Sequence, residues 1–267
     1  GYLRGQTPNP CIDCNRYMKF NKLLERAKLL GCDKLATGHY ARIEFDGRKY
    51  RLKKALDKSK DQSYVLYMLT QEQLAHTLFP LGSLHKADTR AIADAADLSS
   101  ARKPDSQDIC FVPDGDYAAA IERLTGIKAP CGNFIDASGK VIGTHRGITH
   151  YTVGQHRGLG LSLPERRYVC GIDAESGTVT LGGSDELYSS TAEVHGFNWI
   201  SGETPAEPIR CTAKIRYRQP EQPATAIARS DGSVTLHFDA PQRAVTPGQA
   251  AVLYDGNTVL GGGEIVR

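Results

Sequence analysis

The feature that most constrains the fold is a change in residue pattern near residue 130. Downstream of it, Gly, Thr, Val and Ile dominate, and short alternating runs are separated by turn pairs such as Ser176-Gly177, Asp231-Gly232 and Asp255-Gly256. Apolar and polar residues that alternate between such turns are typical of half-buried strands. We therefore predict β structure from about residue 130 onward, with a small closed barrel around the Pro-rich loop at residues 201–208.

The first part of the chain has the pattern of an α/β fold. Apolar residues follow a helical stripe over residues 20–30, and Gly31 stands where a left-handed C-cap is favoured. Residues 34–37 then predict a short buried strand, and Gly38 and His39 follow its carboxyl end, where open α/β sheets bind ligands. Helix followed by strand indicates part of an α/β sheet whose earlier units are absent from the sequence.

Two further local signals lie between residues 40 and 125. The pair Asp46-Gly47 separates the runs 41–45 and 48–52, which predicts a hairpin that reaches out from the sheet. Helices are predicted behind the capping box Thr70 to Gln73 and over residues 86–98 and 117–124.

Length, charge and cysteine content narrow the class of protein. At 267 residues the chain has room for two or three domains, which commonly run about 100 to 150 residues each. No apolar run approaches the roughly 18 residues of a membrane helix, so no membrane is expected. Residues 1–10 lack both a secretory signal and an initiator methionine, and we expect a fragment or a processed piece. Seven scattered cysteines indicate a reducing, cytoplasmic setting, and a net charge of +3 is compatible with nucleic acid.

Two cysteines three positions apart, Cys11 and Cys14, form the first candidate site. Zinc would need two more soft ligands at comparable spacing, and no second Cys-x-x-Cys occurs. A redox pair would need a preceding strand, and the plainest alternative is that both are small buried residues. Cys14 is also predicted to lie a few residues before a helix start, where the helix dipole favours a reactive thiolate.

Four other motifs also have possible functional roles. Cys110 follows a polar loop and is either a strand-edge residue or a reactive thiol. Residues 60–64 form a helical turn with an acidic cap, or present a cation, a carboxylate and an amide to a ligand. Residues 151–160 form a Gly-rich loop with a basic centre, which is either a phosphate-binding loop or only a flexible connection. Arg216-Tyr217-Arg218, predicted on a barrel strand, combines cations with an aromatic ring as nucleic-acid grooves do.

These motifs occur together and in a fixed order along the chain. In sequence they read GQTPNPCIDCN, ATGHYAR, KDQSYVL, SQDICF, HYTVGQHRGLG, IRYRQ and TPGQAAVLY. In this order they resemble the successive motifs of the tRNA-specific 2-thiouridylases, and the resemblance covers essentially the whole chain.

The resemblance implies an ATP-dependent enzyme, with Mg²⁺ beside the ATP, that replaces the C2 oxygen of the wobble uridine of tRNA with sulfur. In the family, ATP adenylates that oxygen and a cysteine persulfide delivers the sulfur. Cys110 would bear the persulfide, received from a sulfur-donor protein that itself carries one. Cys14 would be the second catalytic thiol, able to form a disulfide with Cys110, and no tightly bound metal cluster is expected.

The same matching assigns binding residues. Gly38 would contact ATP. Asn9, Pro10 and Cys11 fall where the family contacts the target base, which must be flipped out of the anticodon loop because C2 is unreachable in a stack. The full set of implied tRNA contacts is Asn9, Pro10, Cys11, His39, Lys60, Asp61, Gln62, Arg216, Tyr217 and Gln249.

The implied fold is a multidomain α/β plus β protein. Residues 1–115 would be the C-terminal part of a Rossmann-like adenine-nucleotide α-hydrolase (PP-loop ATPase) domain, 116–188 a small central domain and 189–267 a C-terminal β-barrel. The family's Ser-Gly-Gly-x-Asp-Ser loop, which cradles the phosphates, does not occur in the sequence. We therefore expect this chain alone to be inactive in thiolation. The alternatives are a non-catalytic tRNA-binding fragment and a zinc-dependent RNA-binding module that uses Cys11 and Cys14.

Overall fold

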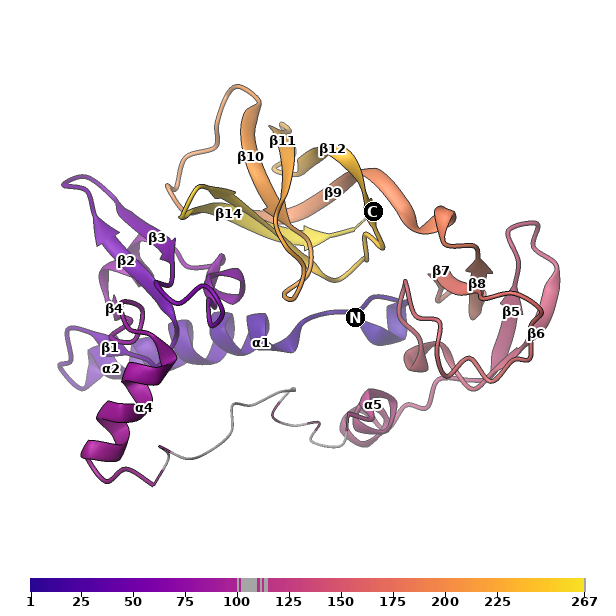
Figure 1. Cartoon of the computed structure of the whole chain (residues 1–267), viewed down its shortest axis with the longest axis horizontal. Coiled ribbons are helices and arrows are strands. Elements are labelled where there is room, and N and C mark those ends of the chain that lie inside the picture. The colour runs from indigo at the N-terminus through magenta and orange to yellow at the C-terminus, as the bar shows by residue number, and fades with distance from the viewer. Residues whose placement is uncertain (100, 102–109, 111, 113–114, 267) are drawn as a thin grey trace.

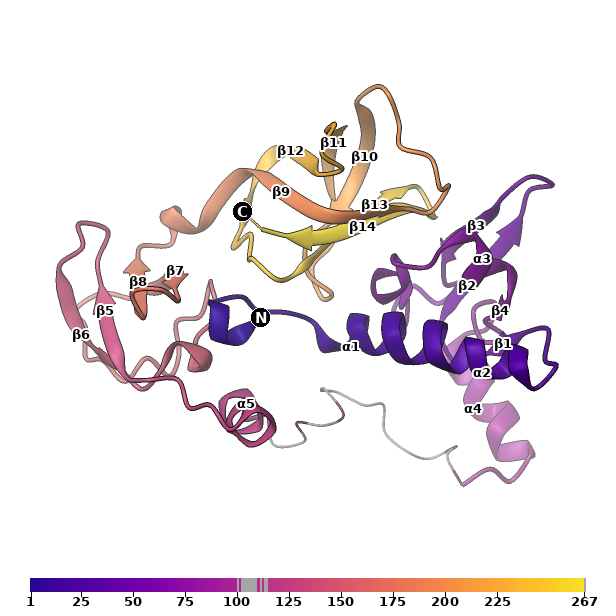
Figure 2. The ribbon, with the colours of Figure 1, turned by 180° about the vertical axis from the view of Figure 1, so that it is seen from behind.

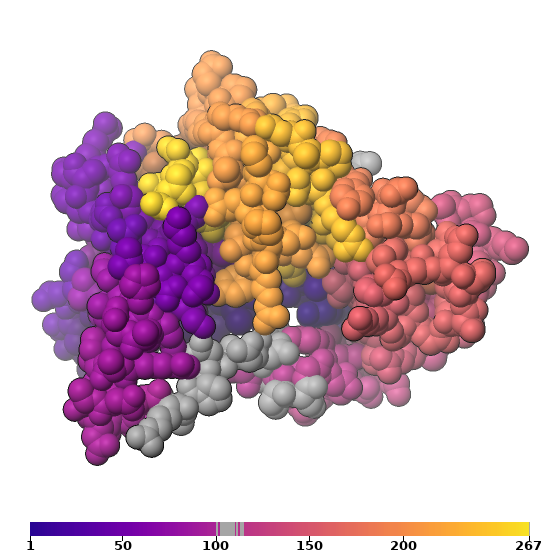
Figure 3. Space-filling view, in the orientation of Figure 1, coloured from indigo at the N-terminus to yellow at the C-terminus, as the bar shows by residue number. Residues whose placement is uncertain are grey.

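The computed structural model describes residues 1–99, 101, 110, 112 and 115–266. Figure 1 shows three parts: an N-terminal part with most of the helices, a central sheet on the opposite side, and a C-terminal barrel above the chain that joins them. Figure 3 shows the surfaces of the barrel and the N-terminal part in direct contact. In the described part of the chain, no helix is long and apolar enough to cross a membrane.

One continuous helix dominates the N-terminal part. It comprises α1 (Pro10–Asp13), a π-helical segment η2 (Cys14–Leu23) and α2 (Leu24–Leu29), and Gly31 follows with the predicted positive φ of 75°. The helix begins earlier than the apolar stripe predicts, because Asn9 caps it by accepting a hydrogen bond from the Cys11 amide and Pro10 occupies the first turn. Cys14 therefore lies inside the helix, and the prediction that it precedes the helix start is wrong.

The strands of the N-terminal part only partly follow the prediction. β1 (Leu35–Ala36) pairs in parallel with β4 (Thr77–Leu78), as an α/β sheet requires. The strand was expected to be buried, yet Ala36 is exposed, because this sheet has only two strands among the described residues. The hairpin β2 (Ala41–Phe45) and β3 (Tyr50–Lys54) is confirmed.

The three other predicted helices are present at Gln71–Ala75, Lys86–Ala95 and Tyr117–Thr125, although the second ends earlier than residue 98, and the short turns at 2–4, 148–150 and 185–187 were not predicted. The capping box at Thr70 is present, with both of its reciprocal hydrogen bonds. The short and regular helices outside the long N-terminal one are η1 (Tyr2–Arg4), η3 (Ser63–Leu66), α3 (Gln71–Ala75), α4 (Lys86–Ala95), α5 (Tyr117–Thr125), η4 (Ile148–His150) and η5 (Asp185–Leu187).

The central part is a sheet with the strand order β6-β5-β8-β7. Its strands are β5 (Gly132–Ile135), β6 (Val141–His145), β7 (Tyr168–Asp173) and β8 (Thr178–Gly182). The fully buried Phe134 packs edge-on against His145 and Tyr151, with ring centroids 5.2 Å away in each case. This aromatic cluster forms the centre of a core separate from that of the barrel.

The C-terminal part is a closed six-stranded barrel, which confirms the prediction. Its strands are β9 (Tyr188–Trp199), β10 (Ile209–Lys214), β11 (Gln222–Ala228), β12 (Val234–Arg243), β13 (Ala250–Asp255) and β14 (Thr258–Ile265). They pair in the order β13-β10-β11-β12-β9-β14, and β14 returns to β13. The prediction that Arg216 and Tyr217 lie on a strand is wrong, because β10 ends at Lys214 and the chain then turns, with Gln219 N donating to Arg216 O.

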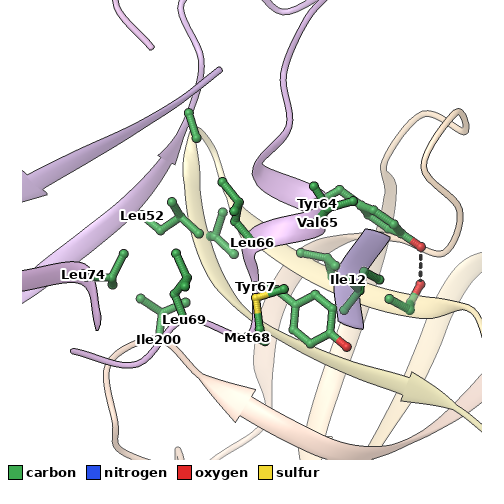
Figure 4. Close-up of a cluster of buried hydrophobic side chains, with 14 of the residues drawn as sticks. Ile12, Leu52, Tyr64, Val65, Leu66, Tyr67, Met68, Leu69, Leu74 and Ile200 are labelled. Atoms are coloured by element: carbon green, nitrogen blue, oxygen red, sulfur yellow. Dashed lines mark hydrogen bonds between the residues drawn. The ribbon is translucent and has the colours of Figure 1, made fainter. Parts of the chain in front are cut away.

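The N-terminal part and the barrel share one core. Figure 4 shows Tyr64, Leu66, Tyr67 and Leu69 converging on barrel residues, with the Tyr64 hydroxyl donating to the Ala250 carbonyl at 2.8 Å. A Cβ at Gly262 of β14 would come within 2.8 Å of the Tyr67 ring, so only glycine permits this approach. The hairpin also pairs with the barrel through Lys53 and Thr258. The two parts are therefore held as one body.

Candidate functional site

A cleft of about 860 Å³ lies where the three parts meet. The N-terminal segment before α1 runs through this junction, between the helix and the central sheet and beneath the barrel, in both Figure 1 and Figure 2. We call residues 1–9 the strap. Residues from every part line the cleft: Tyr2, Thr7, Pro8 and Asn9 of the strap, Asp116, Tyr117, Arg146, His150 and Gln155 of the central part, and Arg216, Tyr217, Arg218 and Gln249 of the barrel.

Gln249 holds the strap in place. Its Nε2 donates to the Thr7 carbonyl at 2.5 Å, and the Thr7 amide donates to the Pro247 carbonyl at 2.9 Å. Gly248 has a φ of 88°, and a Cβ there would lie 2.8 Å from the Thr7 nitrogen. The barrel therefore fixes the segment that leads directly into Asn9 and the helix carrying Cys14.

Arg216 joins the barrel to the central part. Its Nη2 donates to the Val153 carbonyl at 2.9 Å, to the Ala244 carbonyl at 3.3 Å and to the Thr246 hydroxyl. Burial lowers the pKa of Arg216, and its Nε is buried without a hydrogen-bond partner among the residues the structure describes. The guanidinium is therefore a fixed positive charge in the cleft wall.

Tyr217 brings several predicted tRNA contacts together. Its ring, 38% exposed, packs against Tyr64 with centroids 5.8 Å apart. Burial raises the pKa of Tyr217, the negative charges of Asp61 and Cys11 raise it further, and the positive charge of Lys60 opposes them. The charges of Cys11, Lys60 and Asp61 therefore all act on the Tyr217 hydroxyl.

Asp61 and Gln62 also organise their own loop. Asp61 Oδ1 accepts from the Ala55 amide at 2.9 Å, and Oδ2 accepts from the Ser63 hydroxyl at 2.7 Å. Gln62 Oε1 accepts from the Tyr40 amide at 3.0 Å. Asp61 also accepts from the Ser63 amide, but the N-cap residue of η3 is Gln62 and its side chain makes no capping bond, so the predicted acidic cap is wrong.

Gly38 and His39 lie away from this cleft. Gly38 is exposed at the carboxyl end of β1, and the nearest atom to a Cβ there would be Leu81 Cδ1 at 3.8 Å. His39 is buried, with its ring 5.8 Å from both Phe20 and Phe79 and a 2.8 Å hydrogen bond between Nδ1 and Thr37 Oγ1. Burial lowers its pKa to about 4. His39 as a tRNA contact stays a prediction.

The two predicted catalytic thiols are both accessible. Cys14 and Cys110 are exposed free thiols, so no disulfide joins them in this structure, and their pairing during a reaction stays a prediction. Cys14 is held beside Asn15, whose buried side chain donates to the Val65 carbonyl at 3.1 Å. The rest of the SQDICF motif, at residues 106–109 and 111, lies outside the described residues.

The residues that the structure describes do not form a metal site. No group of three or more His, Cys, Asp or Glu side chains in residues 1–99, 101, 110, 112 and 115–266 is arranged to hold an ion.

The central-part wall of the cleft was missed by sequence reasoning. Tyr117, Arg146 and His150 line it, and of these only His150 falls in a recognised motif. Burial lowers the pKa of His150, and the positive charge of Arg146 lowers it further. Tyr117 and Arg146 are ordinary in their local sequence, so only the folded chain reveals them.

Three family models match successive parts of the chain and indicate the class of protein. Residues 1–114 match the family model described as tRNA methyl transferase HUP domain, 123–183 the tRNA methyl transferase PRC-barrel domain, and 189–265 the Aminomethyltransferase beta-barrel domain. A Rossmann-like HUP domain, a PRC-barrel and a six-stranded barrel around a basic, aromatic cleft define a multidomain tRNA-modifying protein.

Individual relatives then specify the family. The chain is 51% identical over 266 residues to the tRNA-specific 2-thiouridylase MnmA of Acetivibrio thermocellus, covering 99% of this chain and 74% of the relative. It is 50% identical to the protein of the same name from Geotalea uraniireducens, covering 99% of this chain and 70% of that protein. The chain belongs to the tRNA-specific 2-thiouridylase family.

Proposed function

We propose that this chain is the tRNA-binding and sulfur-transferring portion of an enzyme that thiolates C2 of the wobble uridine of tRNA. The observation that carries the proposal is the cleft, where the strap residue Asn9 meets Tyr217 and the fixed charge of Arg216. Cations beside an exposed aromatic ring suit an unstacked nucleobase and its phosphate. The proposal divides the chain into residues 1–115, 116–188 and 189–267.

Two thiols supply the sulfur chemistry. The terminal sulfur of a persulfide on Cys110 would attack C2 of the adenylated base, and the bond from C2 to the former O2 would break, with that oxygen leaving as part of AMP. The Cys14 thiolate then attacks the Cys110 sulfur, which releases the thiolated base and leaves a Cys14–Cys110 disulfide. Thiolates and persulfides are strong nucleophiles near neutral pH, and both cysteines are exposed, as such attack requires.

The cofactor in this proposal is ATP with Mg²⁺. Gly38 fits a nucleotide-contacting role, because its exposed backbone stands at the carboxyl end of a parallel strand with space for a ligand against it. Bound ATP would supply the adenylyl group that makes the uracil O2 a good leaving group. The chain's own task is to hold the base, with Asn9, Pro10 and Cys11 at the start of the helix that also carries Cys14.

The proposal includes two macromolecular partners and a location. The partners are tRNA and a sulfur-donor protein that carries a persulfide, and the proposed location is the cytoplasm. The proposed tRNA contacts are Asn9, Pro10, Cys11, His39, Lys60, Asp61, Gln62, Arg216, Tyr217 and Gln249. Support is strongest for Asn9, Arg216, Tyr217 and Gln249, which line the cleft, and for Cys11, Lys60 and Asp61, whose charges act on Tyr217.

Direct binding tests the proposal. The chain should bind tRNA with a wobble uridine, and log affinity should fall linearly as log salt rises because phosphates are neutralised. Cys110→Ser should leave this affinity unchanged. In a chimera that adds the unmatched quarter of the Acetivibrio thermocellus relative, the same substitution should abolish ATP-dependent thiolation. A flat salt response, or a Cys110→Ser chimera that still thiolates, would contradict the proposal.

A further inference from the structure

The cleft has a second wall that the proposed contacts of the target base do not use. Asn9, a proposed contact of the target base, belongs to the strap, and Tyr217, a proposed tRNA contact, belongs to the barrel. Tyr117, Arg146 and His150 line the cleft from the central part. A volume of about 860 Å³ lies near the top of the range, roughly 300–1,000 Å³, of sites that enclose a small ligand. The cleft thus has room for more than a single base.

Aromatic surface covers part of this second wall. The rings of Tyr2 and Tyr117 are nearly parallel, at 17°, with centroids 6.2 Å apart, and both side chains are partly exposed and line the cleft. Tyr117 is fixed in the first turn of α5, which Asp116 caps by accepting from the Ala119 amide at 3.0 Å. A rigid, flat, partly exposed ring of this kind is a stacking surface for a base.

Hydrogen-bonding and charged groups line the same cleft as the rings. Arg146 and His150 line the same wall, and the Arg146 charge interacts with the His150 imidazole. A cleft wall that carries both a guanidinium and an aromatic ring suits a nucleotide, since one group can meet the phosphate and the other the base. Flipping the target out of the anticodon loop also leaves its two neighbours unstacked, and these are then free to find another partner.

We propose that the central-part wall is a second nucleotide subsite, in which the Tyr117 ring stacks on the base next to the target uridine and Arg146 contacts its phosphate. This inference rests on the proposed function and adds a source of tRNA selectivity to it. The subsite discriminates by the stacking strength of the flanking base.

A cycle of protein and RNA changes tests the subsite. The affinity of the whole chain for an anticodon stem-loop RNA is measured by fluorescence anisotropy, with Tyr117→Ala, Tyr117→Phe and RNAs that are abasic at either neighbour of the target. Tyr117→Ala should weaken binding of the intact RNA about tenfold, within the range of base–aromatic stacking, and Tyr117→Phe should restore it. For one of the two abasic RNAs, Tyr117→Ala should have no further effect.

Arg146 has its own readout. Arg146→Gln should reduce the slope of log affinity against log salt by about one, because one phosphate contact is lost. Tyr188→Ala is the matched control, since Tyr188 is 49% exposed at the start of β9 and is not among the cleft-lining residues the structure describes. It should change affinity less than twofold.

The outcomes separate this inference from the proposed function. If the chain binds the stem-loop no better than a scrambled RNA of equal length, both fail. The second outcome is selective binding in which Tyr117→Ala weakens affinity by the same factor for the intact RNA and for both abasic RNAs. That result would refute only the subsite. An unchanged salt slope in Arg146→Gln removes the phosphate contact from the proposal.

Discussion

Arg216 should contribute more to the junction of the barrel and the central part than a surface arginine would. The perturbation is Arg216→Met, which keeps an unbranched side chain of similar length and removes every donor. In the wild type, Arg216 Nη2 donates hydrogen bonds to the Val153 and Ala244 carbonyls and to the Thr246 hydroxyl. A hydrogen bond from a charged group contributes about 1.5–3 kcal/mol, so we expect a loss of about 2 kcal/mol from this shared set of contacts.

Hydrogen exchange followed by mass spectrometry measures the loss of stability at the junction of the barrel and the central part. A loss of about 2 kcal/mol corresponds to roughly thirtyfold faster exchange wherever local opening of this junction governs the rate. The effect should appear in peptides covering residues 150–156 and 243–249. Arg229→Met is the control, because Arg229 bonds Thr235 on the exposed barrel surface at 3.1 Å, and it should change exchange less than twofold. An Arg216→Met protein that exchanges like the wild type in both segments would refute the assignment.

Three other predictions follow from individual residues. His39 has a pKa of about 4 in the fold against about 6.5 when unfolded, so the unfolded chain binds more protons between these pH values. The free energy of unfolding should therefore fall by about 3 kcal/mol as the pH drops from 6.5 to 4. Denaturant titrations at several pH values measure it, and the same pH dependence in wild type and His39→Gln would contradict the prediction. Gly248→Ala should destabilise the strap by at least about 1 kcal/mol, through its φ of 88° and the 2.8 Å approach to Thr7, seen as faster proteolysis after residue 4; an unaltered cleavage rate would argue against the clamp. Burial raises the pKa of Cys211 to about 11, so iodoacetamide at pH 8 should modify exposed Cys14 well before Cys211, and the reverse order by peptide mapping would be inconsistent with the structure.

Local chemistry made several elements predictable. The Asp46-Gly47 turn, the Thr70 capping box and the Gly31 C-cap each depend on a few adjacent residues, and each is present in the structure. The closed barrel followed from short alternating runs between turn pairs. These features are encoded at a range of two to ten residues, the range over which residue patterns carry most information.

Other features depend on contacts that no local pattern encodes. The helix starts at Pro10 rather than near residue 20 because Asn9 caps it, and the buried Asn15 interrupts the apolar stripe that would otherwise reveal the first turns. Arg216 lies outside the predicted strand because β10 makes its last pairing with β13 at Lys214, opposite Val252. The second cleft wall is assembled from Tyr117 and residues about 30 positions later, which only tertiary packing brings together.

The central claim is that the cleft between strap, barrel and central part holds the wobble uridine. A tRNA with the photoreactive base 4-thiouridine at the wobble position tests it most directly, through crosslinking to the chain and mass spectrometry of the linked peptides. The account predicts crosslinks in the segment from Asn9 to Cys14 or at Tyr217, lost on competition with unmodified tRNA. Crosslinks confined to the β5–β6 hairpin, or to the outer surface of β11 and β12, would contradict it.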